Sequence, residues 1–124
     1  MSLYTIFAED GNFSDKTKTT IAEEITRIHV EVMKVPKSFV RVVFLSYARG
    51  CGYTAGAKAP TVALNCVLRL GHTAQEKNDM LKRLWSMFQQ LTGVGTEQLA
   101  ISLQEIPASN AMEMGQVMQD VANK

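Results

Sequence analysis

One strand–helix–strand unit occurs twice along the chain, and this repetition limits the possible folds more than any other feature. The first unit, residues 1–47, opens with the β-branched and aromatic run Leu3-Tyr4-Thr5-Ile6-Phe7, which predicts a strand. A helix follows, and Pro36 is predicted to end it. Residues 39–45 are apolar at nearly every position, which predicts a second strand covered on both faces. The helix is predicted from one apolar stripe, formed by Ile21, Ile25, Ile28 and Val32.

The second unit, residues 61–105, has the same order of elements. Residues 61–68 predict a strand, and the Thr73-Ala-Gln-Glu76 capping box opens a helix that Gly93 ends. Alternating apolar and polar residues over 99–104 predict a half-buried fourth strand. The predicted apolar face of the helix consists of Leu81, Leu84, Trp85, Phe88 and Leu91.

These elements predict a single domain over residues 1–124, of the α/β (α+β) class. The two strands of each unit should be parallel and joined by a right-handed crossover, with both helices on one face of a four-stranded sheet. Residues 48–60 form a loop that holds three of the eight glycines, and a loop of this length is more often functional than idle. Residues 106–124 form a Met-rich C-terminal tail. The second sheet face is apolar but would be exposed in a monomer, which favours self-association.

The composition excludes several classes of protein. Of 124 residues, 46% are hydrophobic and 20% are charged, so the chain is neither disordered nor collagen-like. The formal net charge of +1 supplies no field for nucleic acid or an anionic membrane. No signal peptide or membrane-spanning apolar run occurs, which predicts a cytoplasmic protein. Cys51 and Cys66 lack framework spacing, so we expect two free thiols and no metal site.

No phosphate-binding, dinucleotide-binding or zinc motif occurs, so the candidates for chemistry are a few polar residues at the ends of elements. Arg69 is either a surface charge or an anion-binding group, since it follows a strand and precedes a helix N-terminus. Glu113 is a lone carboxylate among apolar neighbours, which suits proton transfer if it is buried and means little if it points to solvent. His29 lies just off the first apolar stripe, and periodicity alone favours a structural histidine.

Three stretches match one family pattern in register. They are Ile25-Thr26-Arg27-Ile28-His29, Leu68-Arg69-Leu70-Gly71-His72-Thr73, and Gln104-Glu105-Ile106-Pro107-Ala108 through Glu113-Met114-Gly115. With the doubled unit, they resemble the tautomerase superfamily, in particular the branch that contains cis-3-chloroacrylic acid dehalogenase. The likeness runs from about Tyr4 to Gln116.

The resemblance implies a homotrimer of fused β-α-β units that acts on a small carboxylate substrate without a cofactor. Members use an amino-terminal proline, freed by removal of the initiator methionine, as the base in keto–enol tautomerisation. In the dehalogenase branch the proline acts as an acid while a glutamate activates water for hydration or dehalogenation of an unsaturated acid. By this resemblance, His29 matches the family histidine that contacts the substrate carboxylate or polarises its surroundings. Arg69 matches the first carboxylate-binding arginine, and Glu113 matches the water-activating glutamate.

Three positions depart from the family pattern. Ser2 stands where the family has its proline, either through a natural loss or because an added Met-Ser-Leu start replaced Met-Pro, so the implied catalytic group there is a chain-start amine. His72 replaces a second carboxylate-binding arginine, which should make binding weaker and pH-dependent. Ser102 replaces a tyrosine that positions water. The changes at positions 72 and 102 argue against an efficient dehalogenase and favour a promiscuous tautomerase or a hydratase. A non-catalytic carboxylate-binding or interaction protein, which all three departures motivate, is the alternative.

Overall fold

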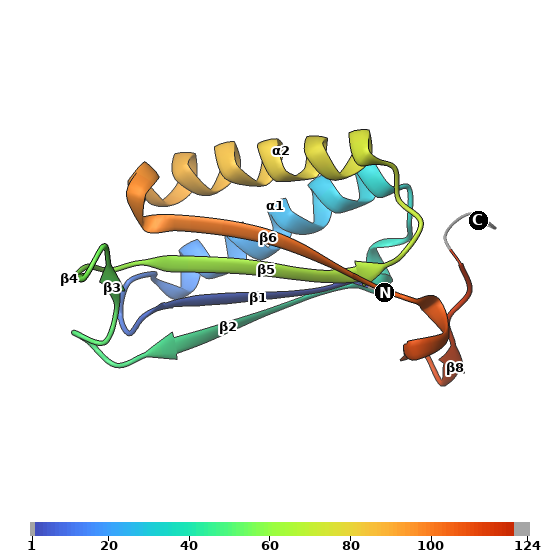
Figure 1. Ribbon diagram of the computed structural model, residues 1–124, viewed down its shortest axis with the longest axis horizontal. Helices are drawn as coiled ribbons and strands as arrows, with labels where there is room; N and C mark the ends of the chain where they lie inside the picture. Colours follow the sequence, from blue (N-terminus) through green and yellow to red (C-terminus); the bar gives the residue numbers. More distant parts are fainter. Residues whose placement is uncertain (1, 121–124) are drawn as a thin grey trace.

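Two helices pack against one face of a four-stranded sheet in the computed structural model, which describes residues 2–120 (Figure 1). The helices are α1 (Asp15–Met33) and α2 (Ala74–Thr92). The strands of the sheet are β1 (Ser2–Glu9), β2 (Val40–Tyr47), β5 (Val62–Arg69) and β6 (Leu99–Ile106). Short 3-10 turns, η1 (Lys37–Phe39) and η2 (Thr96–Gln98), lead into β2 and β6. The predicted order of elements is confirmed.

The strand order in the sheet is β2-β1-β5-β6. β1 is parallel to β2 and β5 is parallel to β6, while β1 and β5 are antiparallel. Each unit therefore has the predicted parallel pair. In this register Ser2 lies opposite both Val40 and Leu68, and Arg69 lies opposite Ile106. The starts of β1 and β2 and the ends of β5 and β6 thus meet at one end of the sheet.

Local chemistry explains the helix ends. The Ser14 side chain accepts a hydrogen bond from the backbone N–H of Thr17 at the start of α1. We expected Pro36 to end α1, but the helix ends at Met33 because Lys34 adopts the left-handed conformation, with φ 58°. The capping box at the start of α2 and the left-handed Gly93 after it, with φ 71°, are as predicted.

The core lies between the helices and the sheet. On α2 its buried side chains are Met80, Leu84, Met87 and Phe88. The predicted apolar face was therefore partly wrong: Leu91 is 38% exposed, and Trp85 packs at the margin of the core. The long methionines take these central positions because they fill irregular space between α2 and the sheet. Within residues 2–120, no helix combines the length and the apolar character that a membrane span requires.

The sheet face opposite the helices is open and apolar. Side chains alternate along each strand, so Tyr4 and Ile6 of β1 are buried beneath the helices while Phe7 points away from them, 45% exposed. Val43 and Leu45 of β2 are each 43% exposed on that face. The expectation that residues 39–45 are covered on both faces is therefore wrong for one chain, because β2 is an edge strand with one open face.

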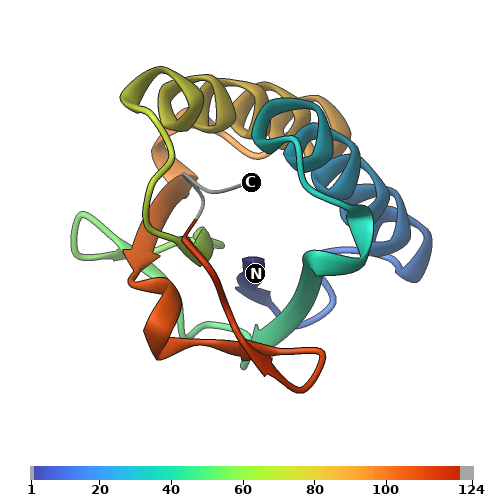
Figure 2. The same cartoon turned by 90° about the vertical axis from the view of Figure 1, so that its right-hand side faces the viewer.

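Two short hairpins lie in segments that we expected to be a loop and a tail. β3 (Tyr53–Thr54) pairs with β4 (Ala57–Lys58), and β7 (Met112–Glu113) pairs with β8 (Gln116–Val117) after the 3-10 turn η3 (Ala108–Asn110). In each turn a non-glycine residue at positive φ precedes a glycine, namely Ala55-Gly56 and Met114-Gly115. These are not the usual Asn-Gly or Asp-Gly pairs, so neither hairpin was predicted. Figure 2 shows the tail passing across the end of the sheet beside the start of β2.

Candidate active site

Two neighbouring cavities lie where the tail crosses the end of the sheet. One, of about 350 Å³, is lined by Ser2, Leu3 and Arg41 and by the β7–β8 turn, residues 112–115. The other, of about 260 Å³, is lined by Phe39, Arg69, Glu113, Met114 and residues 116–119. Glu113 and Met114 line both. The topology thus brings the start of β1, the end of β5 and the tail to one place.

Arg69 is buried and retains donor capacity. As the last residue of β5 it is 8% exposed, so the alternative of a surface charge is wrong. Its Nη1 donates to the carbonyl oxygen of Gln119 at 2.6 Å, whereas its buried Nε has no hydrogen-bond partner among residues 2–120. No acidic side chain in that range is within ion-pair distance of it. A guanidinium in this state is suited to bind an anion, because the planar fork matches a carboxylate.

Glu113 is also buried, on β7. Its side chain is 2% exposed, so the alternative that it points to solvent is wrong. Nη1 of Arg41 lies 2.7 Å from its Oε2. Arg41 was not among the residues predicted for the site. The available signal was that Arg41 is the single charge within the apolar run 39–45. The pairing of β2 with β1 then places Arg41 opposite Leu3, near the start of β1.

Ser2 is fully buried at the start of β1 and lines the larger cavity. Its hydroxyl donates to the carbonyl oxygen of Phe39 at 3.0 Å. The terminal amine of the sequence belongs to Met1, which lies outside the described residues. The position at which the resemblance implies a chain-start amine therefore adjoins the larger cavity, which Glu113 also lines.

His29 lies in the core and lines neither cavity. It is 2% exposed, and its Nδ1 lies 2.6 Å from the Tyr4 hydroxyl, with the two rings perpendicular. Burial raises the pKa of Tyr4 well above its usual range, so the tyrosine keeps its proton and can donate it to Nδ1. The roles that the resemblance implies for His29, Arg69 and Glu113 require all three to lie around one substrate. The structure brings Arg69 and Glu113 to one cavity, whereas His29 lies in the core.

Cys66 is paired across the sheet with Tyr4, and burial raises the pKa of its thiol from about 9 to about 12. Both cysteines are free, as predicted, and Cys51 is exposed.

We expect a thiol reagent at pH 8 to label Cys51 at once and Cys66 only after denaturation, because roughly one Cys66 in ten thousand would be a thiolate. The folded state keeps this proton longer than the unfolded state, so the free energy of unfolding should fall as pH rises from about 9 to about 12. Immediate labelling of both thiols in native buffer would contradict this account.

The two remaining predicted site residues lie at different places. His72, in the connection from β5 to α2, is 9% exposed, and its Nδ1 lies 3.9 Å from Oε1 of Glu76. Ser102 is exposed on the open sheet face, where its hydroxyl donates to Oδ1 of Asn65 at 2.8 Å. Within one chain Ser102 is therefore on the opposite face from the core. Among residues 2–120, no three His, Cys, Asp or Glu side chains gather closely enough to hold a metal ion.

Comparison with known proteins decides the family. A family model described as "Putative oxalocrotonate tautomerase enzyme" matches residues 1–112. The chain belongs to the tautomerase superfamily. The predicted membership is thereby confirmed. No curated protein matches this tautomerase-family sequence significantly.

Solved structures of similar proteins share the fold of this tautomerase-family chain. A crystal structure of native Ps01740 is 29% identical, with a TM-score of 0.87, and the match covers 90% of this chain and 99% of that one. N1, a member of the cis-3-chloroacrylic acid dehalogenase family, is 25% identical with a TM-score of 0.91, over 98% of this chain and 86% of its own. The fold is also that of Q0 fused 4-OT, solved as a symmetric trimer, which is 20% identical with a TM-score of 0.86 over 98% of this chain and 99% of its own.

Proposed function

We propose that this protein is an enzyme that moves a proton within a small 2-keto or unsaturated carboxylate, as in keto–enol tautomerisation. The observation that carries the proposal is that a buried guanidinium, Arg69, and a buried carboxylate, Glu113, line the same cavity. Arg69 holds the substrate carboxylate, because its Nε is available as a donor. Membership of the tautomerase superfamily supports the reaction class.

The charges of the site suit a small monoanion. Arg41 and Glu113 form an ion pair, so Arg69 supplies the net positive charge of the two cavities.

In the proposed tautomerisation, an amine at the start of β1 takes the proton from the enol oxygen and delivers a proton to the substrate carbon. The O–H bond breaks, a C–H bond forms and the double bond moves to oxygen. Atoms and charge therefore balance without a cofactor.

Hydration or dehalogenation of an unsaturated acid is the alternative chemistry at the same site. There Glu113 takes a proton from water as the oxygen adds to one alkene carbon, and the protonated amine gives a proton to the other carbon. A contribution of His72 to carboxylate binding stays a prediction, because His72 lines neither cavity. The roles of His29 and Ser102 also stay predictions. His29 lies in the core and lines neither cavity, and Ser102 could act only where another subunit meets the open sheet face.

We also propose that the chain forms a homotrimer. The open sheet face exposes large apolar side chains at Leu3, Phe7, Val43 and Leu45, and contiguous apolar surface of this kind marks an interface. The trimer found for a structure of the same fold supports this arrangement. Three copies would cover the three equivalent faces by one closed symmetric contact.

Turnover of candidate substrates tests the function. Two forms are compared, one with Ser2 and one that starts with proline at that position, with phenylenolpyruvate, 2-hydroxymuconate and 3-haloacrylates as substrates. We expect the proline form to turn over at least one of them and the serine form to be slower. The reason is that burial and a nearby guanidinium both lower the pKa of the proline amine, so more of it is unprotonated and able to act as a base at neutral pH. In the serine form the terminal amine belongs to Met1, one residue away. The absence of turnover by both forms at high enzyme concentration would contradict the proposal.

A non-catalytic carboxylate-binding protein is the second candidate. One observation favours it, since Ser2 replaces the proline and its hydroxyl is engaged by the Phe39 carbonyl. Calorimetry would then show carboxylate binding that depends on Arg69, with no turnover by either form. Activity in the proline form that Arg69→Ala abolishes would exclude this candidate.

A further inference from the structure

We propose that Arg41 is a positioning residue that holds Glu113 in place as a proton acceptor. The inference rests on the hydration or dehalogenation form of the proposed function, because Glu113 accepts a proton only in that chemistry. Its basis is one ion pair, in which Nη1 of Arg41 lies 2.7 Å from Oε2 of Glu113.

The two side chains of this pair have unlike surroundings. That of Glu113 is 2% exposed, whereas that of Arg41 is 46% exposed, so the guanidinium lies toward solvent and the carboxylate lies inside. Both line the larger cavity, and among the described residues the only other charged side chain lining either cavity is Arg69. A buried carboxylate is costly without a nearby positive charge, and Arg41 supplies one. An ionised carboxylate accepts protons and donates none.

Arg41 and Glu113 come from parts of the chain that only the fold joins. Arg41 lies on β2 opposite Leu3 of β1, and Glu113 lies on β7 in the tail. The ion pair therefore fixes the tail hairpin to the sheet beside the start of β1, where the proposed amine base lies. Through it, Arg41 fixes the orientation of the carboxylate toward the cavity.

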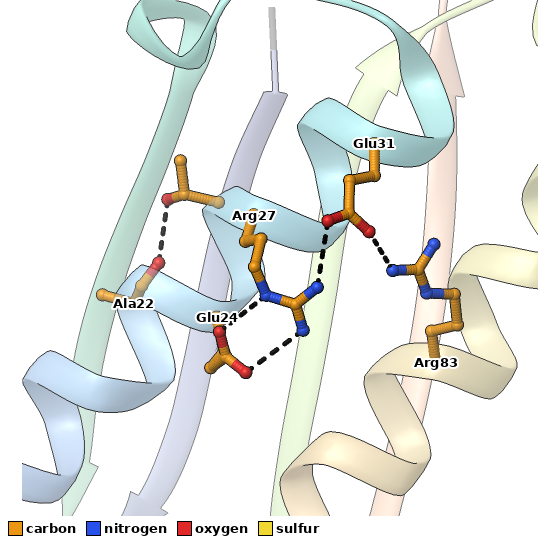
Figure 3. Close-up of polar contacts among 6 residues, drawn as sticks. Ala22, Glu24, Arg27, Glu31 and Arg83 are labelled. Atoms are coloured by element: carbon orange, nitrogen blue, oxygen red, sulfur yellow. Dashed lines mark hydrogen bonds and ion pairs between the residues drawn. The ribbon is translucent and has the colours of Figure 1, made fainter.

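The ion pairs on the helices are of a different kind. On α1, Arg27 lies between Glu24 and Glu31, and Arg83 of α2 reaches Glu31 (Figure 3). Each of these three pairs has an acid at least 35% exposed, so solvent screens it and its contribution is small. The acid in the Arg41 pair is far more buried than these.

A double-mutant cycle tests the proposal. Arg41→Gln, Glu113→Gln and the double variant are compared in the proline-start form, with 3-haloacrylates as substrates, because their hydration or dehalogenation uses Glu113. We expect Arg41→Gln to lower kcat by roughly tenfold or more with little change in KM, and to have almost no further effect once Glu113 is replaced by glutamine. Arg41→Lys should recover most of the loss, because it restores the charge. Arg27→Gln is the matched control, since Arg27 is 50% exposed and paired with exposed acids.

Two outcomes would overturn the proposal. An equal loss from Arg41→Gln with and without the Glu113→Gln change would mean that Arg41 does not act through Glu113. A rise in KM at constant kcat would mean that Arg41 acts on substrate binding instead. The unfolding midpoint in urea, measured over the same four proteins, needs no substrate. If the two substitutions together shift this midpoint by less than the sum of their single shifts, the ion pair is supported even where no substrate is turned over and the proposed function fails. If the shifts add, the ion pair is rejected.

Discussion

Arg69→Ala is expected to lower kcat/KM for a carboxylate substrate by about 100-fold or more, the largest effect of any single change at the site. A charge-assisted pair at a buried site is worth several kcal/mol when one partner is removed. Arg69 is 8% exposed, and within residues 2–120 its Nε has no hydrogen-bond partner, so Arg69→Ala removes a buried donor that is available to the substrate carboxylate. Steady-state kinetics and calorimetry of carboxylate binding measure the loss.

Arg69→Lys is the matched control for this prediction. It keeps the charge but not the planar fork, so we expect activity between those of the native protein and Arg69→Ala. Because Arg69 also donates to the carbonyl of Gln119, the thermal midpoint of each variant must be measured. Unchanged carboxylate affinity in a folded Arg69→Ala protein would remove the basis of the proposed function.

Phe7→Glu is expected to convert a trimer into monomers. Phe7 is 45% exposed at the open sheet face, among the apolar side chains Leu3, Val43 and Leu45. A trimer that covers this face would bury three carboxylates without counter-charges, which costs several kcal/mol for each. Sedimentation equilibrium should give about three times the chain mass of 13.7 kDa for the native protein and the chain mass for the variant.

Leu91→Glu is the control for the assembly prediction. Leu91 is 38% exposed near the end of α2, so the same charge there should leave the trimer intact. A native protein that sediments as a monomer would contradict the trimer. Persistence of the trimer in Phe7→Glu would place its interface elsewhere.

The candidate site was predicted in part. The residue types and positions singled out Arg69 and Glu113, and the structure brings both to the same cavity. The sequence could not decide whether either side chain is buried or exposed. A residue at a strand end or in a tail hairpin has the same local sequence pattern whether or not other segments cover it. Arg41 was missed because its partner is far away in the sequence. His29 was assigned to the site by the resemblance, whereas packing against Tyr4 places it in the core.

Local patterns determined the order of elements and the family. Apolar periodicity, a capping box and a left-handed glycine act over a few residues, so they can be read without knowing the fold. The register of β1 between β2 and β5, the path of the tail and the Arg41–Glu113 pair were decided only by tertiary structure. The physical reason is that burial and ion pairing depend on which distant segments meet, and the sheet brings those segments together.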